Sequence, residues 1–95
     1  KIICSARAVA DLESVVRHIA RDDSAAAEQI GNSLIDRVLI LQNFQFLGSP
    51  YAKKPGVRKL VSRPYIIFYR AQPEEGRVEI LRYWHGARRE PELND

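Results

Sequence analysis

Residues 57–85 read VRKLVSRPYIIFYRAQPEEGRVEILRYWH, and this stretch decides the fold. Three runs rich in β-branched and aromatic residues are separated by two turn signals, Arg63-Pro64 and the segment 73–76. Such runs, bounded by short turn-forming segments, are typical of an antiparallel meander. The sequence therefore predicts three strands that lie side by side in chain order.

The last of these runs places an arginine among apolar residues. One alternating set of the run consists of Val78, Ile80, Arg82 and Trp84. Because alternate residues of a strand lie on the same face, Arg82 is expected to have apolar neighbours. An arginine is rarely buried without a partner, so we expect either an anionic ligand or an acidic side chain to cover it.

The N-terminal half has the pattern of two helices. After a short β-prone run at residues 1–5, residues 6–21 carry one apolar stripe with helical spacing. Residues 22–24 supply N-cap candidates for a second helix over residues 25–46. The predicted order is a short strand, a two-helix hairpin and a three-stranded antiparallel meander (βααβββ). This is an α+β fold with one sheet packed on the helices, and residues 1–95 form a single domain.

The second helix has an apolar arc wider than one contact requires. Its main stripe is formed by Ala27, Ile30, Leu34, Val38 and Leu41, and the stripe is widened by Ile35, Leu39 and Phe46. A one-sided surface helix needs an arc of only about 100°. The helix therefore packs against both the first helix and the sheet, or it offers part of the arc to a partner. A glycine in mid-helix, Gly31, predicts close approach of the two helices.

Several classes of function lack their residue patterns. The candidate metal ligands other than carboxylates are His18, His85 and Cys4, and their spacing gathers no site. No glycine-rich phosphate loop is present, so neither a metal nor a cofactor is expected. Cys4 follows two isoleucines and is expected to be buried. No run is long enough to span a membrane and no signal-peptide pattern begins the chain, so a cytoplasmic location is expected.

Charge is distributed unevenly along the chain. Residues 1–47 carry five basic and six acidic groups, whereas residues 48–95 carry ten basic and six acidic groups. The C-terminal half therefore has a net charge of +4 within a chain total of +3. This asymmetry indicates an anionic partner, either nucleic acid or an acidic protein segment. The alternative is a solvated sheet edge protected by its charges.

Basic and aromatic residues are concentrated in the predicted meander. The set consists of Arg58, Lys59, Tyr65, Tyr69, Arg82, Tyr83, Trp84, His85 and Arg88. Such groups can cleave RNA without a metal by stabilising the phosphorane and protonating the leaving oxygen. They can equally hold a protein partner, because Tyr, Trp and Arg dominate interface hot spots. Composition does not separate these alternatives. The polar tail after Gly86 has little to bury and is expected to be mobile unless a partner orders it.

The order of elements and several motifs resemble the RelE/ParE superfamily of toxins from type II toxin-antitoxin modules. The resemblance covers nearly the whole chain. The motifs that carry it are the helix segment 8–20 (AVADLESVVRHIA), GSPY at 48–51, VRKL at 57–60, RPYIIFYR at 63–70 and VEILRYWHGAR at 78–88.

The RelE-like branch consists of ribosome-dependent mRNA endonucleases, and this chain departs from its pattern. That branch implies lysines in the first meander strand, where this chain has Lys59 but also Val57. It implies an arginine directly after the tyrosine that opens the next strand, where this chain has Ile66. The tail after Arg88 contains no tyrosine. If the chain were a nuclease, Lys59, His85 and Arg88 would be its catalytic residues.

The HGAR ending at 85–88 and the apolar strand at 65–69 look instead like the ParE branch. That branch implies a protein without catalytic chemistry that inhibits DNA gyrase and traps its cleaved complex with DNA. It also implies neutralisation by a ParD-like antitoxin, a ribbon-helix-helix protein with an acidic amphipathic C-terminal segment. Such a partner would account for both the positive half-chain and the wide apolar arc.

Two sets of interaction residues follow from this hypothesis. The predicted antitoxin-binding residues are four arginine anchors and three apolar groove residues: Arg58, Arg63, Arg70, Arg82, Leu34, Val38 and Leu41. The predicted target-binding residues follow the end of the last strand: Trp84, His85, Arg88 and Arg89.

Overall fold

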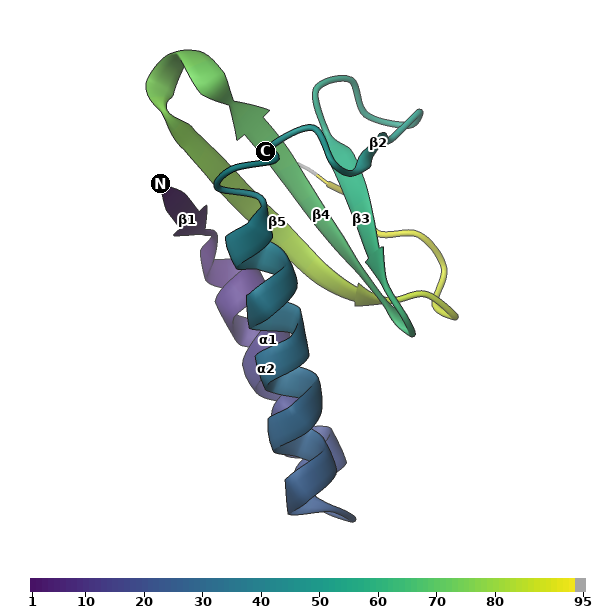
Figure 1. The fold of residues 1–95 in the computed structure, drawn as a ribbon. Coiled ribbons are helices and arrows are strands. Elements are labelled where there is room, and N and C mark those ends of the chain that lie inside the picture. The colour runs from purple at the N-terminus through teal and green to yellow at the C-terminus, as the bar shows by residue number, and fades with distance from the viewer. Residues whose placement is uncertain (94–95) are drawn as a thin grey trace.

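A hairpin of two helices lies against one face of a mixed five-stranded sheet, and its tip extends beyond the end of the sheet (Figure 1). The structure, a computed structural model, describes residues 1–93. Its elements are β1 (Ile2–Cys4), α1 (Ala6–Ala20), α2 (Ser24–Ile40), β2 (Ser49–Pro50), β3 (Arg58–Ser62), β4 (Tyr65–Gln72), a 3-10 turn (Pro73–Glu75) and β5 (Arg77–His85). The predicted domain and tail continue to residues 94–95, which lie outside the described residues.

The sheet has the strand order β1-β5-β4-β3-β2. β3, β4 and β5 form the predicted antiparallel meander, and β1 pairs in parallel with β5, with Ile2 opposite Val78. The predicted α+β fold is therefore confirmed. β2 was not predicted, and its two residues pair with Lys59 and Arg58 of β3. A proline in this edge strand gave no periodic signal.

Both helices begin at capping side chains. Ser5 Oγ accepts a hydrogen bond from the Ala8 N–H at 3.0 Å, and Asp23 Oδ1 accepts one from the Ala26 N–H at 3.0 Å. α2 ends at Ile40, six residues before the predicted end at Phe46. The segment after Ile40 turns toward β2, where Tyr69 Oη donates to the Gln45 carbonyl at 2.8 Å. The apolar residues after Ile40 extended the helical pattern but do not continue the helix.

The main core lies between the helices and the inner face of the sheet. Leu34, Val38 and Leu41 are 1%, 4% and 0% exposed and belong to this core. Their prediction as a partner groove is therefore wrong, because the sheet itself covers them. The predicted close approach at Gly31 is confirmed, since a Cβ there would lie 3.1 Å from Val16 Cγ2.

A second apolar cluster lies on the outer face of the sheet. It is formed by Tyr51, Val57, Phe68 and Trp84. Leu93 packs against this cluster and Pro91 is buried. Lys54 Nζ donates to the Leu93 carbonyl, and Lys53 pairs with Glu90 at 2.5 Å. The tail through Leu93 is thus part of the fold, contrary to the predicted mobility, because Leu93 packs against this cluster.

A β-bulge changes which residues of β5 face the helices. Phe68 pairs with Arg82 but the next residue of β4, Tyr69, pairs with Ile80, so Leu81 is the extra residue. Before the bulge Ile80 lies in the main core, and after it Tyr83 does. Arg82 therefore does not share a face with Ile80, and the predicted regular alternation along this strand is wrong.

Cys4 is exposed rather than buried, because it ends the edge strand β1. Partial burial raises the pKa of its thiol above the usual value. Within residues 1–93, no helix combines the length and the apolar character needed to cross a membrane. In the same residues, no three His, Cys, Asp or Glu side chains are grouped as metal ligands.

Gly48 occupies a position that has no room for a side chain. Its N–H donates to Tyr69 Oη at 2.9 Å, and a Cβ would lie 2.5 Å from the Lys59 carbonyl oxygen. Gly48→Ala is therefore expected to lower the free energy of unfolding by about 1–3 kcal/mol, because backbone must move. Urea denaturation measures this loss. Gly31→Ala is the control: it meets only a methyl group, and its better helix propensity offsets part of the crowding. Equal stabilities of the two variants would contradict the prediction.

Candidate functional site

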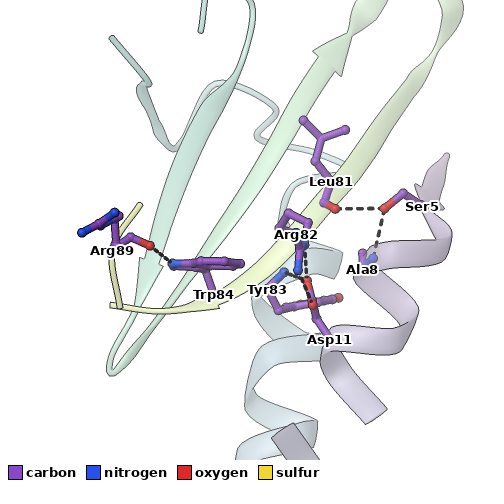
Figure 2. Close-up of polar contacts among 8 residues, drawn as sticks. All are labelled: Ser5, Ala8, Asp11, Leu81, Arg82, Tyr83, Trp84 and Arg89. Carbon is purple, nitrogen blue, oxygen red and sulfur yellow. Dashed lines mark hydrogen bonds and ion pairs between the residues drawn. The ribbon is translucent and has the colours of Figure 1, made fainter. Parts of the chain in front are cut away.

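The C-terminal half of β5 is an edge that α1 covers in place of a strand. β1 pairs with β5 only as far as Ile80. Beyond it, Ser5 Oγ donates to the Leu81 carbonyl at 2.9 Å, and Asp11 Oδ2 accepts from the Tyr83 N–H at 3.1 Å (Figure 2). Polar side chains at the start of α1 thus satisfy backbone groups that lack a strand partner.

Asp11 also holds Arg82 in a two-pronged ion pair (Figure 2). Arg82 Nε donates to Asp11 Oδ2 at 2.7 Å and Nη2 donates to Oδ1 at 2.8 Å. The side chains are 18% and 15% exposed. The hydrogen bond that Arg82 donates to Asp11 raises the pKa of the Arg82 guanidinium above its usual value. The sequence predicted that either an anionic ligand or an acidic side chain covers Arg82, and the structure shows the acidic side chain of Asp11. Because this pair occupies its guanidinium, Arg82 is not available as an antitoxin anchor.

Of the other three predicted anchors, Arg70 lines one pocket together with Arg82, whereas Arg58 and Arg63 are not among its lining residues. Arg58 Nε donates to the Gly48 carbonyl at 3.0 Å, and its guanidinium lies 5.1 Å from the centre of the Phe46 ring. Arg70 pairs with Glu79 at 3.6 Å. Arg63 is exposed in the turn between β3 and β4. The positive charge of the meander is therefore dispersed, and much of it is paired within the chain.

Exposed apolar residues are concentrated in one segment of the chain. Of the large hydrophobic residues exposed within positions 1–93, six lie between residues 35 and 47: Ile35, Leu39, Ile40, Phe44, Phe46 and Leu47. We call these six residues the apolar segment. The wide apolar arc predicted for the second helix thus divides into two parts. Its main stripe faces the core, whereas Ile35, Leu39 and Phe46 are 43%, 49% and 60% exposed. This density of exposed apolar side chains makes the segment a candidate interaction surface.

Three of the four predicted target-binding residues, Trp84, Arg88 and Arg89, are in contact at the end of β5, whereas His85 lies on the other face of the sheet against Tyr65. Two guanidinium groups lie near the Trp84 ring, that of Arg82 at 4.9 Å and that of Arg88 at 3.9 Å from the ring centre. Trp84 Nε1 donates to the Arg89 carbonyl at 2.9 Å (Figure 2). Trp84 is only 9% exposed, so it supports this end of the chain, whereas Arg88 and Arg89 are exposed.

The three residues of the nuclease alternative do not converge. His85 lies on the inner face, where its ring meets the Tyr65 ring at 5.3 Å between centres. Lys59 pairs with Phe68 of the outer cluster, and its Nζ lies 6.0 Å from the centre of the Tyr51 ring. Since paired residues share a face, Lys59 and His85 lie on opposite faces of the sheet. Only His85 and Arg88 of this set are neighbours.

His85 and Arg88 line a small pocket between α1 and the end of the sheet. The pocket has a volume of about 190 Å³ and is lined by Asp11, Ser14, Val15, His18, Tyr65, Tyr83, His85 and Arg88. Burial raises the pKa of both tyrosines, that of Tyr83 to about 12, so both phenols stay neutral near pH 7. Ser14 and His18 were not predicted to line this site. Their i, i+4 spacing, which places them on one side of α1, was the available signal.

The comparisons with known proteins agree with this architecture. The family described as "ParE toxin of type II toxin-antitoxin system, parDE" matches residues 2–90. This chain belongs to the ParE toxin family. A solved structure titled "Chromosomal ParDE TA system from P. aeruginosa" matches with a TM-score of 0.77 and 26% identity, over 90% of this chain and 94% of that chain. Among curated proteins, none matches the sequence.

Membership of the ParE family confirms the resemblance drawn from the sequence. In this ParE-family chain the structure separates two candidate surfaces. One is the apolar segment after and along α2, and the other is the cationic end of β5 with the pocket beside it. The first has the character of a protein interface, and the second is rich in hydrogen-bond donors.

Proposed function

We propose that this ParE-family toxin inhibits DNA gyrase by binding, without catalytic chemistry of its own, and is neutralised by a ParD-like antitoxin in the cytoplasm. The observation that carries the proposal is the separation of Lys59 from His85 by the thickness of the sheet. Ile66 supports it, since this residue packs against the outer cluster where a nuclease of the RelE branch would need an arginine. Without a stabilising cation, the phosphorane is expected to form at least about 10²-fold more slowly.

Two assays with the purified toxin distinguish the proposal from the nuclease alternative. We expect loss of DNA supercoiling by gyrase, accumulation of cleaved gyrase–DNA complexes and intact mRNA on ribosomes. Addition of the antitoxin should restore supercoiling, which controls for non-specific inhibition. Unaffected gyrase together with ribosome-dependent mRNA cleavage would favour the RelE-like alternative. Normal growth and normal nucleoids on expression without antitoxin would indicate a family member that has lost toxicity.

The apolar segment is the surface that fits the antitoxin best. An acidic amphipathic segment of a ribbon-helix-helix partner needs exposed apolar contacts flanked by positive charge. Ile35, Leu39 and Phe46 provide the exposed apolar contacts. They replace the predicted groove residues Leu34, Val38 and Leu41, which are buried in the core. Arg58, which lies over the Phe46 ring, provides the positive charge. Of the predicted anchors, Arg58 is therefore the one best placed for this role.

A further inference from the structure

Both histidines of the chain, 67 residues apart in sequence, line the same small pocket. α1 contributes Ser14 and His18, while Tyr65 begins β4 and His85 ends β5. The volume of about 190 Å³ is below the ≈ 300–1,000 Å³ typical of pockets for whole small molecules. The pocket therefore suits one small group of a larger ligand.

The groups around the pocket are predominantly hydrogen-bond donors. The Ala87 N–H donates to His85 Nδ1 at 3.1 Å, so the neutral ring carries its proton on Nε2 and donates from there. Arg88 has only donors, and the neutral Tyr65 phenol can donate as well. Ser14 adds a hydroxyl. This donor set matches an oxyanion rather than a cation or an apolar group.

The carboxylate that lines the pocket does not oppose an anion strongly. Both oxygens of Asp11 accept hydrogen bonds from the Arg82 guanidinium, and Oδ2 also accepts the Tyr83 N–H. Its charge is thus balanced by Arg82, which lies within 2.8 Å. Arg88, whose guanidinium lies over the Trp84 ring, adds a positive charge at the edge of the pocket.

Exposed arginines extend the positive charge beyond the pocket. The Gly86 N–H donates to the Pro64 carbonyl at 2.8 Å, which ties the Arg63-Pro64 turn to the segment after β5. Arg63, Arg88 and Arg89 are all exposed at this end of the sheet. Among residues 1–93, none of these three forms an ion pair. A pocket for one oxyanion, flanked by free cations, fits a ligand that carries phosphates at regular intervals.

We propose that this pocket binds a backbone phosphate of DNA, with Arg88 as its main cation and with Arg63 and Arg89 on neighbouring phosphates. If the proposed function holds, it follows that the toxin touches the DNA held by gyrase, and only this consequence rests on the proposed function. Binding to DNA itself is measurable without gyrase. Phosphate contacts position a protein on DNA without reading sequence, so affinity for unrelated duplexes is expected to be similar.

Fluorescence anisotropy with a short labelled duplex, over a series of salt concentrations and without gyrase, tests the inference. Arg88→Gln is expected to weaken binding several-fold and to reduce the slope of log K against log salt by about 1. Ser14→Ala removes a pocket hydroxyl without touching Trp84 and should weaken binding at unchanged slope. Lys1→Gln is the matched control, since it removes one exposed charge beside the start of β5, at the opposite end of this strand from His85. Circular dichroism checks that each variant is folded.

Three outcomes would overturn the inference. The first is no duplex binding at low salt, and the second is equal weakening by Lys1→Gln and Arg88→Gln. The third is displacement of the duplex by inorganic phosphate at matched ionic strength, with no effect of Arg63→Gln or Arg89→Gln, which would indicate a site for a free anion. A toxin that binds DNA through the pocket but leaves gyrase active would uphold the inference while refuting the proposed function.

Discussion

Replacing Asp11 with alanine is expected to lower the free energy of unfolding by about 3–5 kcal/mol, because it removes one partner of a largely buried ion pair. Arg82 would keep its charge with its side chain only 18% exposed. The Tyr83 N–H would lose its acceptor at the edge that no strand covers. Equilibrium urea denaturation followed by circular dichroism measures the loss.

Three further variants test the cause of that loss. Asp36→Ala removes an exposed aspartate of α2 and should leave the stability nearly unchanged. Asp11→Asn keeps an oxygen for the Tyr83 N–H but not the charge, so an intermediate loss is expected. Asp11→Ala combined with Arg82→Met removes both charges and should recover part of the stability. If the double variant is less stable than Asp11→Ala, the unpaired arginine is not the cause.

Local patterns predicted the elements of this fold but not the pairing of its side chains. The turn signals at Arg63-Pro64 and 73–76 correctly divided the meander, since turn chemistry acts over a few residues. The bulge at Leu81 left no trace in the alternation, because one extra residue is visible only against the partner strand. The partner of Arg82 lies 71 positions away and could be predicted only by type.

The candidate sites show the same limit. The apolar arc of the second helix indicated which residues avoid water, but not whether the chain itself or a partner covers them. Leu34 is covered by the sheet, whereas Leu39, five positions later, is 49% exposed. The pocket at His85 depends on α1 lying beside the end of β5, a long-range contact that no local spacing encodes. The contacts of Trp84 with Arg88 and Arg89 join residues that are close in sequence, so they are within the reach of local patterns.

Leu39→Glu is expected to weaken binding of a ParD-like antitoxin by about 30-fold or more, the size of an interface hot spot of 2 kcal/mol. The side chain is half-exposed, so the fold tolerates the change, while a carboxylate at this position would meet both the apolar face and the negative charge of an acidic segment. Isothermal titration calorimetry with the antitoxin's C-terminal segment measures the effect. Ile35→Glu, one helical turn away on α2, should act in the same direction.

Val61→Glu is the matched control for this surface. Val61 is 48% exposed, almost the same as Leu39, but it pairs with Ile66, which packs on the outer face of the sheet. The same substitution there introduces the same charge on the opposite side from the helices, so it should change affinity little. Equal losses for the two variants would mean that net charge, not the apolar segment, governs binding. A loss of affinity confined to Val61→Glu would indicate that the antitoxin binds the outer face of the sheet. Only a loss confined to the α2 variants supports the apolar segment as the antitoxin site.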